Sequence, residues 1–230
     1  MSLADLTPFQ LGALGTATAA AATGLGALGV FLPRLRGRDG FLFLAGASAL
    51  MLLASVFSLA YPAGHLLAPT LPDLAWMVAL VAGLALGAQG LRWLDRGASA
   101  LRRRAEGRGP WLVVFALFLH NIPEGLAVGT ALAGPSPLAG LPLLTGILLH
   151  NLPEGLMVAT LALSWGWKPG RAAGAGFLTG LSEPLAGLLA AGGTVGFPVL
   201  EPWILLGTAG AMIELVRLEI LPQVRAHLRR

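Results

Sequence analysis

The chain alternates long apolar stretches with short polar breaks. Seven stretches are long enough for a membrane-spanning helix, which needs about 20 predominantly apolar residues. The predicted spans cover residues 8–32, 41–62, 72–94, 111–132, 138–164, 171–195 and 202–221. Pro, Gly or Arg is frequent in each break between them. This pattern predicts an all-α fold, a polytopic transmembrane helical bundle that forms one domain over residues 1–230.

Composition supports the same class of protein. Of the 230 residues, 56% are hydrophobic and 11% are charged, and the mean hydropathy is +0.77. A soluble domain carries about 25% charged residues, and a disordered chain has few apolar ones, so both classes are excluded. The chain contains no Cys, which excludes thiolate metal sites and cysteine nucleophiles.

The basic residues are distributed on one side of the predicted bundle. All 15 Lys and Arg fall at or after the end of an odd-numbered span, many of them in an Arg-rich loop predicted for residues 95–110. The positive-inside rule makes that side cytoplasmic, with the N-terminus outside and the C-terminus inside. The high pI therefore indicates membrane topology rather than nucleic-acid binding, and we expect a multi-pass protein of the inner (cytoplasmic) membrane.

Several acidic residues fall inside predicted spans. These are Glu124, Glu154, Glu183, Glu214 and Glu219. A charge at the bilayer centre costs about 2.5–3.5 kcal/mol on insertion scales, so such residues usually mark a site or a pathway. Glu201 is assigned to an outer loop, together with Asp5 and Asp73, and is set aside.

Two of these glutamates belong to a repeat. The motif H-N-x-P-E-G-L occurs at residues 120–126 and again at 150–156, in two spans that run antiparallel. His120 and Glu124 are four residues apart, as are His150 and Glu154, so each pair shares one helix face. At about 1.5 Å per residue, both pairs lie about 14–24 Å into a core about 30 Å thick.

The repeat brings nitrogen and oxygen ligands to the membrane midplane. Imidazole, carboxylate and the amides of Asn121 and Asn151 suit a borderline divalent ion such as Zn²⁺ or Fe²⁺, with Mn²⁺ also open. Pro123 and Pro153 should break the helices and free the carbonyls four residues back as ligands or water acceptors. The alternative interpretation is that each His only hydrogen-bonds within the bundle.

Three further features have both a functional and a structural interpretation. Glu183, followed by Pro184, is predicted near the midplane, where it binds metal or is a protonated carboxyl bonded to a neighbouring helix. Glu214 and Arg217, three residues apart, either mark a site or neutralise each other. Met51 is a soft ligand or ordinary packing.

On these residues the sequence resembles the ZIP (Zrt/Irt-like) family of divalent metal transporters, most of all its bacterial GufA-type branch. The repeated H-N-x-P-E-G is the specific feature, and S-E-P-L and E-I-L-P support it. The resemblance implies a binuclear site, hence two metals per chain, with Glu124 and Glu154 bridging. One metal would be held by Met51, His120, Glu124, His150 and Glu154. The other would be held by Asn121, Glu124, Asn151, Glu154 and Glu183.

The resemblance also implies a transport pathway. The chain would import a divalent metal into the cytoplasm, Zn²⁺ in the first place with Cd²⁺, Fe²⁺ or Mn²⁺ open. The family mechanism is alternating access, and whether the movement is elevator-like or channel-like is left open. Ser58 would line the route in and Glu219 the exit, while His65 stands where the family commonly has an acidic residue. The family usually has eight helices against the seven predicted here. Whether the chain forms a homodimer is left open.

Two other functions remain as alternatives. One is an intramembrane metalloenzyme that uses a metal-bound water. The H-E-x-x-H motif is absent, however, and the expected protein ligands would crowd both metals, so we expect no enzyme. The other alternative is a metal-binding membrane protein that does not transport.

Overall fold

The structure, a computed structural model, describes residues 5–32, 46, 49, 52–104 and 111–221. These residues form helices and short connections, with no β-strand among them. The all-α prediction is therefore confirmed. In the predicted span 41–62, residues 41–45, 47–48 and 50–51 lie outside the described residues, and residues 52–62 belong to an apolar helix over Leu52–Leu67.

The helices follow the predicted spans in order. The long elements are α1 (Pro8–Leu28), α4 (Asp73–Arg104), α5 (Trp111–His120), α6 (Ile122–Ala133), α7 (Leu141–Ser164), α8 (Pro169–Gly180), α9 (Ser182–Gly196) and α10 (Glu201–Leu215). The shorter ones are η2 (Gly29–Phe31), η4 (Ser55–Ala60), α3 (Tyr61–Leu67), η5 (Pro137–Gly140), η6 (Pro198–Leu200) and η7 (Val216–Ile220). Within the described part of the chain, four continuous apolar helices are long enough to cross a membrane: Pro8–Phe31, Leu74–Gly97, Pro137–Ser164 and Pro198–Leu218.

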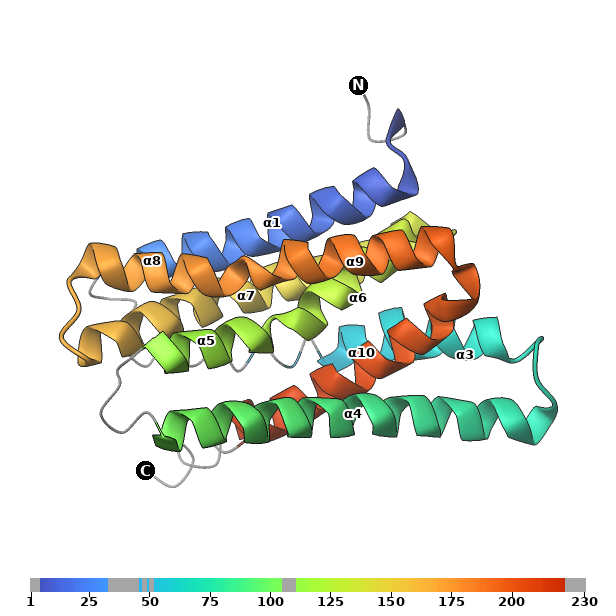
Figure 1. Cartoon of the computed structure of the whole chain (residues 1–230). Coiled ribbons are helices and arrows are strands. Elements are labelled where there is room, and N and C mark those ends of the chain that lie inside the picture. Colours follow the sequence, from blue (N-terminus) through green and yellow to red (C-terminus); the bar gives the residue numbers. More distant parts are fainter. Residues whose placement is uncertain (1–4, 33–45, 47–48, 50–51, 105–110, 222–230) are drawn as a thin grey trace.

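The helices form two layers, which Figure 1 shows one above the other. The first layer, here called the site bundle, contains α1 and the four helices α6 to α9, with α5 at one end. The second, here called the flanking layer, contains η4, α3, α4 and α10. The two layers meet mainly where α10 packs on α6.

Two of the passes are broken near their middle. The pass α5–α6 breaks at Asn121 and the pass α8–α9 at Leu181, and in each a proline follows within three residues, at Pro123 and Pro184. The expectation for Pro153 was wrong, because α7 continues through it from Leu141 to Ser164. The physical reason is packing, because Leu152 and Gly155 on either side of Pro153 lie in close backbone contact with α1.

Glycines allow this close packing. A Cβ on Gly155 would lie 1.9 Å from the carbonyl oxygen of Thr23, and one on Gly26 would lie 1.9 Å from that of Leu152, so α1 and α7 touch through their backbones. A Cβ on Gly125 would likewise lie 2.3 Å from the Glu183 carbonyl oxygen, which joins α6 to α9. Small residues at such contacts are typical of membrane helix pairs.

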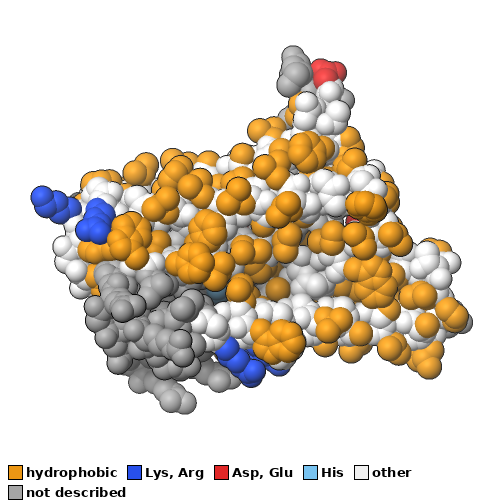
Figure 2. Space-filling model, in the orientation of Figure 1, with side chains coloured by type: hydrophobic (Ala, Val, Ile, Leu, Met, Phe, Trp, Pro, Cys, Tyr) orange, Lys and Arg blue, Asp and Glu red, His pale blue; other side chains and the backbone are white. Residues whose placement is uncertain are grey.

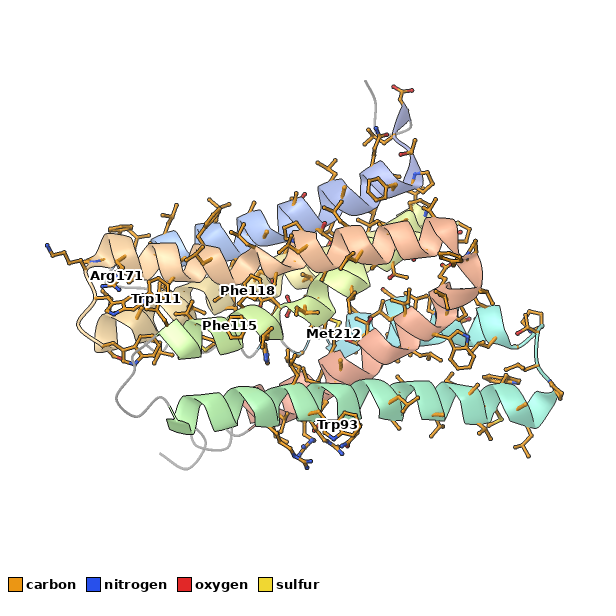
Figure 3. All side chains as sticks on the ribbon, viewed as in Figure 1. Trp93, Trp111, Phe115, Phe118, Arg171 and Met212 are labelled. Atoms are coloured by element: carbon orange, nitrogen blue, oxygen red, sulfur yellow. The ribbon has the colours of Figure 1, made fainter. Side chains whose placement is uncertain are left out.

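The flanking layer exposes a long apolar helix. Only 11% of the most apolar 18-residue stretch of α4, within Leu74–Gly97, is buried. Trp93 projects away from the bundle, as Figure 3 shows. On the side that faces the bundle, a salt bridge joins α4 to α10. Arg92 Nε donates to Glu214 Oε1 at 2.6 Å, and Arg217 Nε donates to Glu214 Oε2 at 2.8 Å. Of the two interpretations left open for Glu214 and Arg217, the structure shows the mutual neutralisation, with Arg92 as a second partner.

The two ends of the bundle differ in chemistry. The guanidinium of Arg171 lies 4.2 Å from the ring centre of Trp167 and 5.4 Å from that of Trp111, at the end where α5 and α8 begin (Figure 3). Apolar side chains cover most of the face in Figure 2, and none of the described Lys and Arg atoms in view lies in its right-hand third. α1 begins at that opposite end, and η7 ends toward the Arg171 end (Figure 1). The cytoplasmic side stays a prediction.

One boundary differs from the predicted loop at 95–110. α4 extends to Arg104, so the first ten residues of that segment are helical. The physical reason is helix propensity, because Ala, Leu and Arg dominate residues 98–104 and are strong helix formers. The remaining residues, 105–110, lie outside the described part of the chain.

Candidate metal centre

Three ionisable side chains meet in the middle of the site bundle. His150 Nε2 of α7 lies 3.7 Å from Glu124 Oε1 of α6 and 3.7 Å from Glu154 Oε2, one turn further along α7. One ligand atom from each residue lies within 4.8 Å of the other two. All three side chains are buried, with at most 3% of any residue exposed.

The spacing of these atoms suits a single metal ion. Ligands in tetrahedral arrangement about 2.1 Å from Zn²⁺ are about 3.4 Å apart, close to the 3.7 Å separations around His150 Nε2. One imidazole and two carboxylates form a borderline-hard set. We call Glu124, His150 and Glu154 the metal triad.

The local fold explains how the carboxylates reach this position. Because the fourth pass breaks at Asn121, Glu124 falls in the first turn of α6. Glu183 falls in the first turn of α9 in the same way, after the break at Leu181. The positive end of a helix dipole favours a carboxylate in its first turn. The two broken passes thus offset part of the cost of burying acids in the membrane.

A second polar cluster surrounds Glu183, which is fully buried. Thr23 Oγ1 donates to Glu183 Oε1 at 2.9 Å, and Asn151 Nδ2 donates to Oε2 at 2.9 Å. Asn121 Nδ2 is more distant, 3.5 Å from Oε1, and Asn151 also donates to the Ala19 carbonyl at 3.1 Å. Both asparagines come from the repeated motif, so each copy contributes to both clusters.

Comparison with known proteins agrees with this geometry. A family model described as ZIP Zinc transporter matches residues 97–229. Zinc transporter GufA of Myxococcus xanthus is 36% identical over 234 residues, which is 92% of this chain and 87% of the relative. Zinc transporter ZIPB of Bordetella bronchiseptica is 38% identical over 223 residues, 91% of this chain and 71% of the relative.

The chain belongs to the ZIP zinc transporter family. It is also similar to zinc transporter ZIP11 of Homo sapiens, at 38% identity over 135 residues, covering 56% of this chain and 38% of the relative. The resemblance to the ZIP family in the sequence is confirmed, and with it the expectation that the protein is a transporter and not an enzyme.

The structure brings together only some of the residues that the ZIP resemblance implies. Glu124, His150 and Glu154 form the metal triad, whereas His120 is half-buried at the last position of α5 and is not one of the three grouped residues. Met51 lies outside the described residues. The side chain of Glu219 does as well, although its backbone is part of η7.

Three features of the structure were not predicted from the sequence. Thr23 and the Ala19 carbonyl, both on α1, bond the cluster around Glu183. A threonine within a predicted span was the available signal, because such residues often hydrogen-bond across membrane helices. Glu201, assigned to a loop, instead begins α10 and is buried. Its position next to Pro198 and Pro202 concealed the start of the helix.

Proposed function

We propose that this chain imports divalent metal, with Zn²⁺ the first candidate, across the cytoplasmic membrane through a site at the bilayer midplane. The observation that carries the proposal is the buried metal triad of Glu124, His150 and Glu154. His150 is close to the midpoint of the apolar span Pro137–Ser164. Two carboxylates in such a place need a cation, a proton or a partner.

We further propose that the site holds two ions. The second would lie between the triad and Glu183, with Glu124 and Glu154 as bridging ligands. The Oδ1 atoms of Asn121 and Asn151 support this, because both are buried and neither accepts a hydrogen bond from the described residues. Together with the Glu183 carboxylate, these oxygens offer a harder ligand set than the triad.

Transport would require the site bundle to move against the flanking layer. The site bundle is knit by backbone contacts at Gly125 and Gly155, so it can move as one piece. Its boundary with the flanking layer is looser. A cavity of about 210 Å³ lies among α4, α10 and the start of α6 beside Pro123, and Gly87, Gly90 and Gly207 line it on the flanking side. This contrast supports an elevator-like movement.

Uptake into proteoliposomes tests the function directly. We expect purified chain to carry Zn²⁺ inward, and Glu124→Ala and Glu154→Ala to abolish uptake. Asp5→Ala, an acid outside the membrane helices, is the matched control and should transport normally. Wild-type protein that binds metal without flux would favour a non-transporting metal-binding protein.

Elemental analysis tests the number of ions. We expect about two metals per chain in the wild type, fewer than one in Glu124→Ala or Glu154→Ala, and about one in Glu183→Ala, since a bridging ligand serves both ions. A stoichiometry of two that survives Glu124→Ala would exclude the bridge. Crosslinking in the same liposomes would test a homodimer, which would use the exposed face of α4.

A further inference from the structure

A second cavity opens at the end of the bundle where α1 begins. It has a volume of about 310 Å³ and lies between the two layers, where η4 and α3 face the end of α6 and the start of α10. Its polar lining comes from Ser58, His65, Ser136 and Glu201. Among the described residues, neither Lys nor Arg lines it. We call it the end cavity.

Glu201 is the unusual residue in this cavity. It is 8% exposed, yet its carboxylate makes no hydrogen bond or ion pair with any described residue. A Cβ on Gly134 would lie 2.6 Å from Glu201 Oε1, so the glycine leaves room for the carboxylate. A buried acid without a partner is costly, and a ligand in the cavity would remove that cost.

His65 supplies the second donor. It lies one turn after Tyr61 on α3, and the two rings meet edge to face with centres 4.4 Å apart. Imidazole and carboxylate are together the donors preferred by Zn²⁺ and similar ions, while Ser58 and water can complete the shell. Two protein ligands give weaker binding than three, as suits an ion that must move on.

We propose that Glu201 and His65 form a capture site, which takes a divalent transition-metal ion from solution before it reaches the metal triad. The inference rests on the proposed transport function. Ala131 also lines the end cavity and is seven residues after Glu124 on α6, which is about 10 Å along the helix axis. The wall of the end cavity at Ala131 is therefore about 10 Å along α6 from the metal triad at Glu124.

A structural role for Glu201 makes a different prediction. A carboxylate in the first turn of α10 interacts favourably with the helix dipole. On that account, Glu201→Gln would lower the melting temperature and leave the metal dependence of uptake unchanged. A capture role predicts an unchanged melting temperature and a changed metal dependence of uptake, because the amide of Gln keeps the shape of the side chain and loses its charge.

Uptake kinetics form the first test. For Glu201→Gln we expect KM for Zn²⁺ to rise about tenfold with Vmax within about twofold of wild type, since binding is lost and translocation is kept. His65→Gln should act in the same direction and serves as the second variant. Asp5→Asn removes an acid three residues before the start of α1 and should leave KM unchanged. An unchanged KM in both cavity variants overturns the capture site.

Thiol labelling provides a second test that does not need transport. Because the chain has no Cys, Ser136→Cys places a single thiol in the end cavity. We expect micromolar Zn²⁺, but not Mg²⁺, to slow maleimide labelling at position 136. The same protection should occur in a Glu124→Ala background, in which the metal triad is disabled. Adding Glu201→Gln should abolish the protection. If Zn²⁺ slows labelling equally with and without Glu201→Gln, the inference is overturned.

The two proposals can fail separately. If the wild type shows no uptake but Zn²⁺ still protects the thiol at position 136 in a Glu201-dependent way, the transport function is rejected and the metal site stands. If the wild type transports normally, Zn²⁺ does not protect the thiol at position 136, and KM is unchanged in Glu201→Gln and His65→Gln, the capture site is rejected and the transport function stands.

Discussion

The two copies of H-N-x-P-E-G-L differ in structure although they are nearly identical in sequence. In the first copy the helix breaks at Asn121, so His120 ends α5 and Glu124 begins α6. In the second copy α7 runs straight through Pro153 and carries His150 and Glu154 on one face. The first copy contributes one residue to the metal triad and the second contributes two.

Packing accounts for this difference. The second copy lies against α1, which is continuous, and close backbone contacts at Leu152 and Gly155 flank the proline. The first copy lies against α9, which itself begins just after a break, and Gly125 touches the Glu183 carbonyl there. The two broken passes thus touch each other at Gly125, and the two continuous helices touch at Gly155, although α1 also packs against α8 and α9. We infer that the close contacts on either side of Pro153 favour the continuous helix there.

The largest expected effect comes from filling the glycine contacts. Gly155→Ala and Gly125→Ala each place a methyl group within 2.3 Å of a carbonyl oxygen, so the helices must separate. We expect a loss of about 3 kcal/mol of stability for each, measured as a lower melting temperature in detergent.

Gly174→Ala is the matched control for both, because no atom lies within 4 Å of the added Cβ. It should change stability by less than about 1 kcal/mol. If Gly125→Ala were as mild as Gly174→Ala, the tight pairing of the broken passes would be contradicted.

The next effect separates the two histidines. His150 lies between both triad carboxylates, so His150→Ala should weaken Zn²⁺ binding by about 100-fold, and His120→Ala by about tenfold or less. Competition with a chromophoric chelator measures both. Equal losses would mean that His120 joins the site when metal binds, as the family resemblance implies.

The asparagines should show a smaller contrast. Asn151 donates to Glu183 and to the Ala19 carbonyl, whereas Asn121 makes one long contact of 3.5 Å. Asn151→Ala should cost about 1–3 kcal/mol of stability and Asn121→Ala about 1 kcal/mol, measured in metal-free buffer. A larger loss for Asn121→Ala would reverse the assigned network.

The smallest effect concerns the prolines themselves. Pro123 is in the first turn of α6, where proline is tolerated, so Pro123→Ala should change stability by less than about 0.5 kcal/mol. Pro153 is inside α7, and Pro153→Ala restores a helical hydrogen bond worth about 1 kcal/mol. Thermal unfolding compares them. A loss of stability in Pro153→Ala would show that the proline is needed where it stands.

Hydrophobic runs were sufficient to predict the helical passes, because each pass must satisfy its backbone within an apolar stretch. The break at Asn121 was also predicted, from Pro123. The continuity of α7 was not, since it depends on how α1 packs against Gly155, and spacing along the chain does not contain that contact. The same holds for the extension of α4 to Arg104.

The candidate site was predictable where it depended on the repeat. The i, i+4 spacing placed His150 beside Glu154, and antiparallel passes brought Glu124 to them. Thr23 and Glu201 were not found, because their roles come from neighbours more than 60 residues away, Glu183 and Gly134 respectively. A buried acid is recognised in a sequence only when its helix is recognised first.

The length of α4 has a consequence for the surrounding lipid. Its 32 residues extend about 48 Å, whereas the hydrocarbon layer is about 30 Å thick. The helix must therefore tilt or project several turns into the headgroups, at the end that carries Arg96 and Arg102–Arg104. Anionic headgroups would attract Arg96, which is exposed at that end. Bilayer thickness and lipid charge should thus set the angle of α4 and, through the salt bridge of Arg92 with Glu214, the resting position of α10.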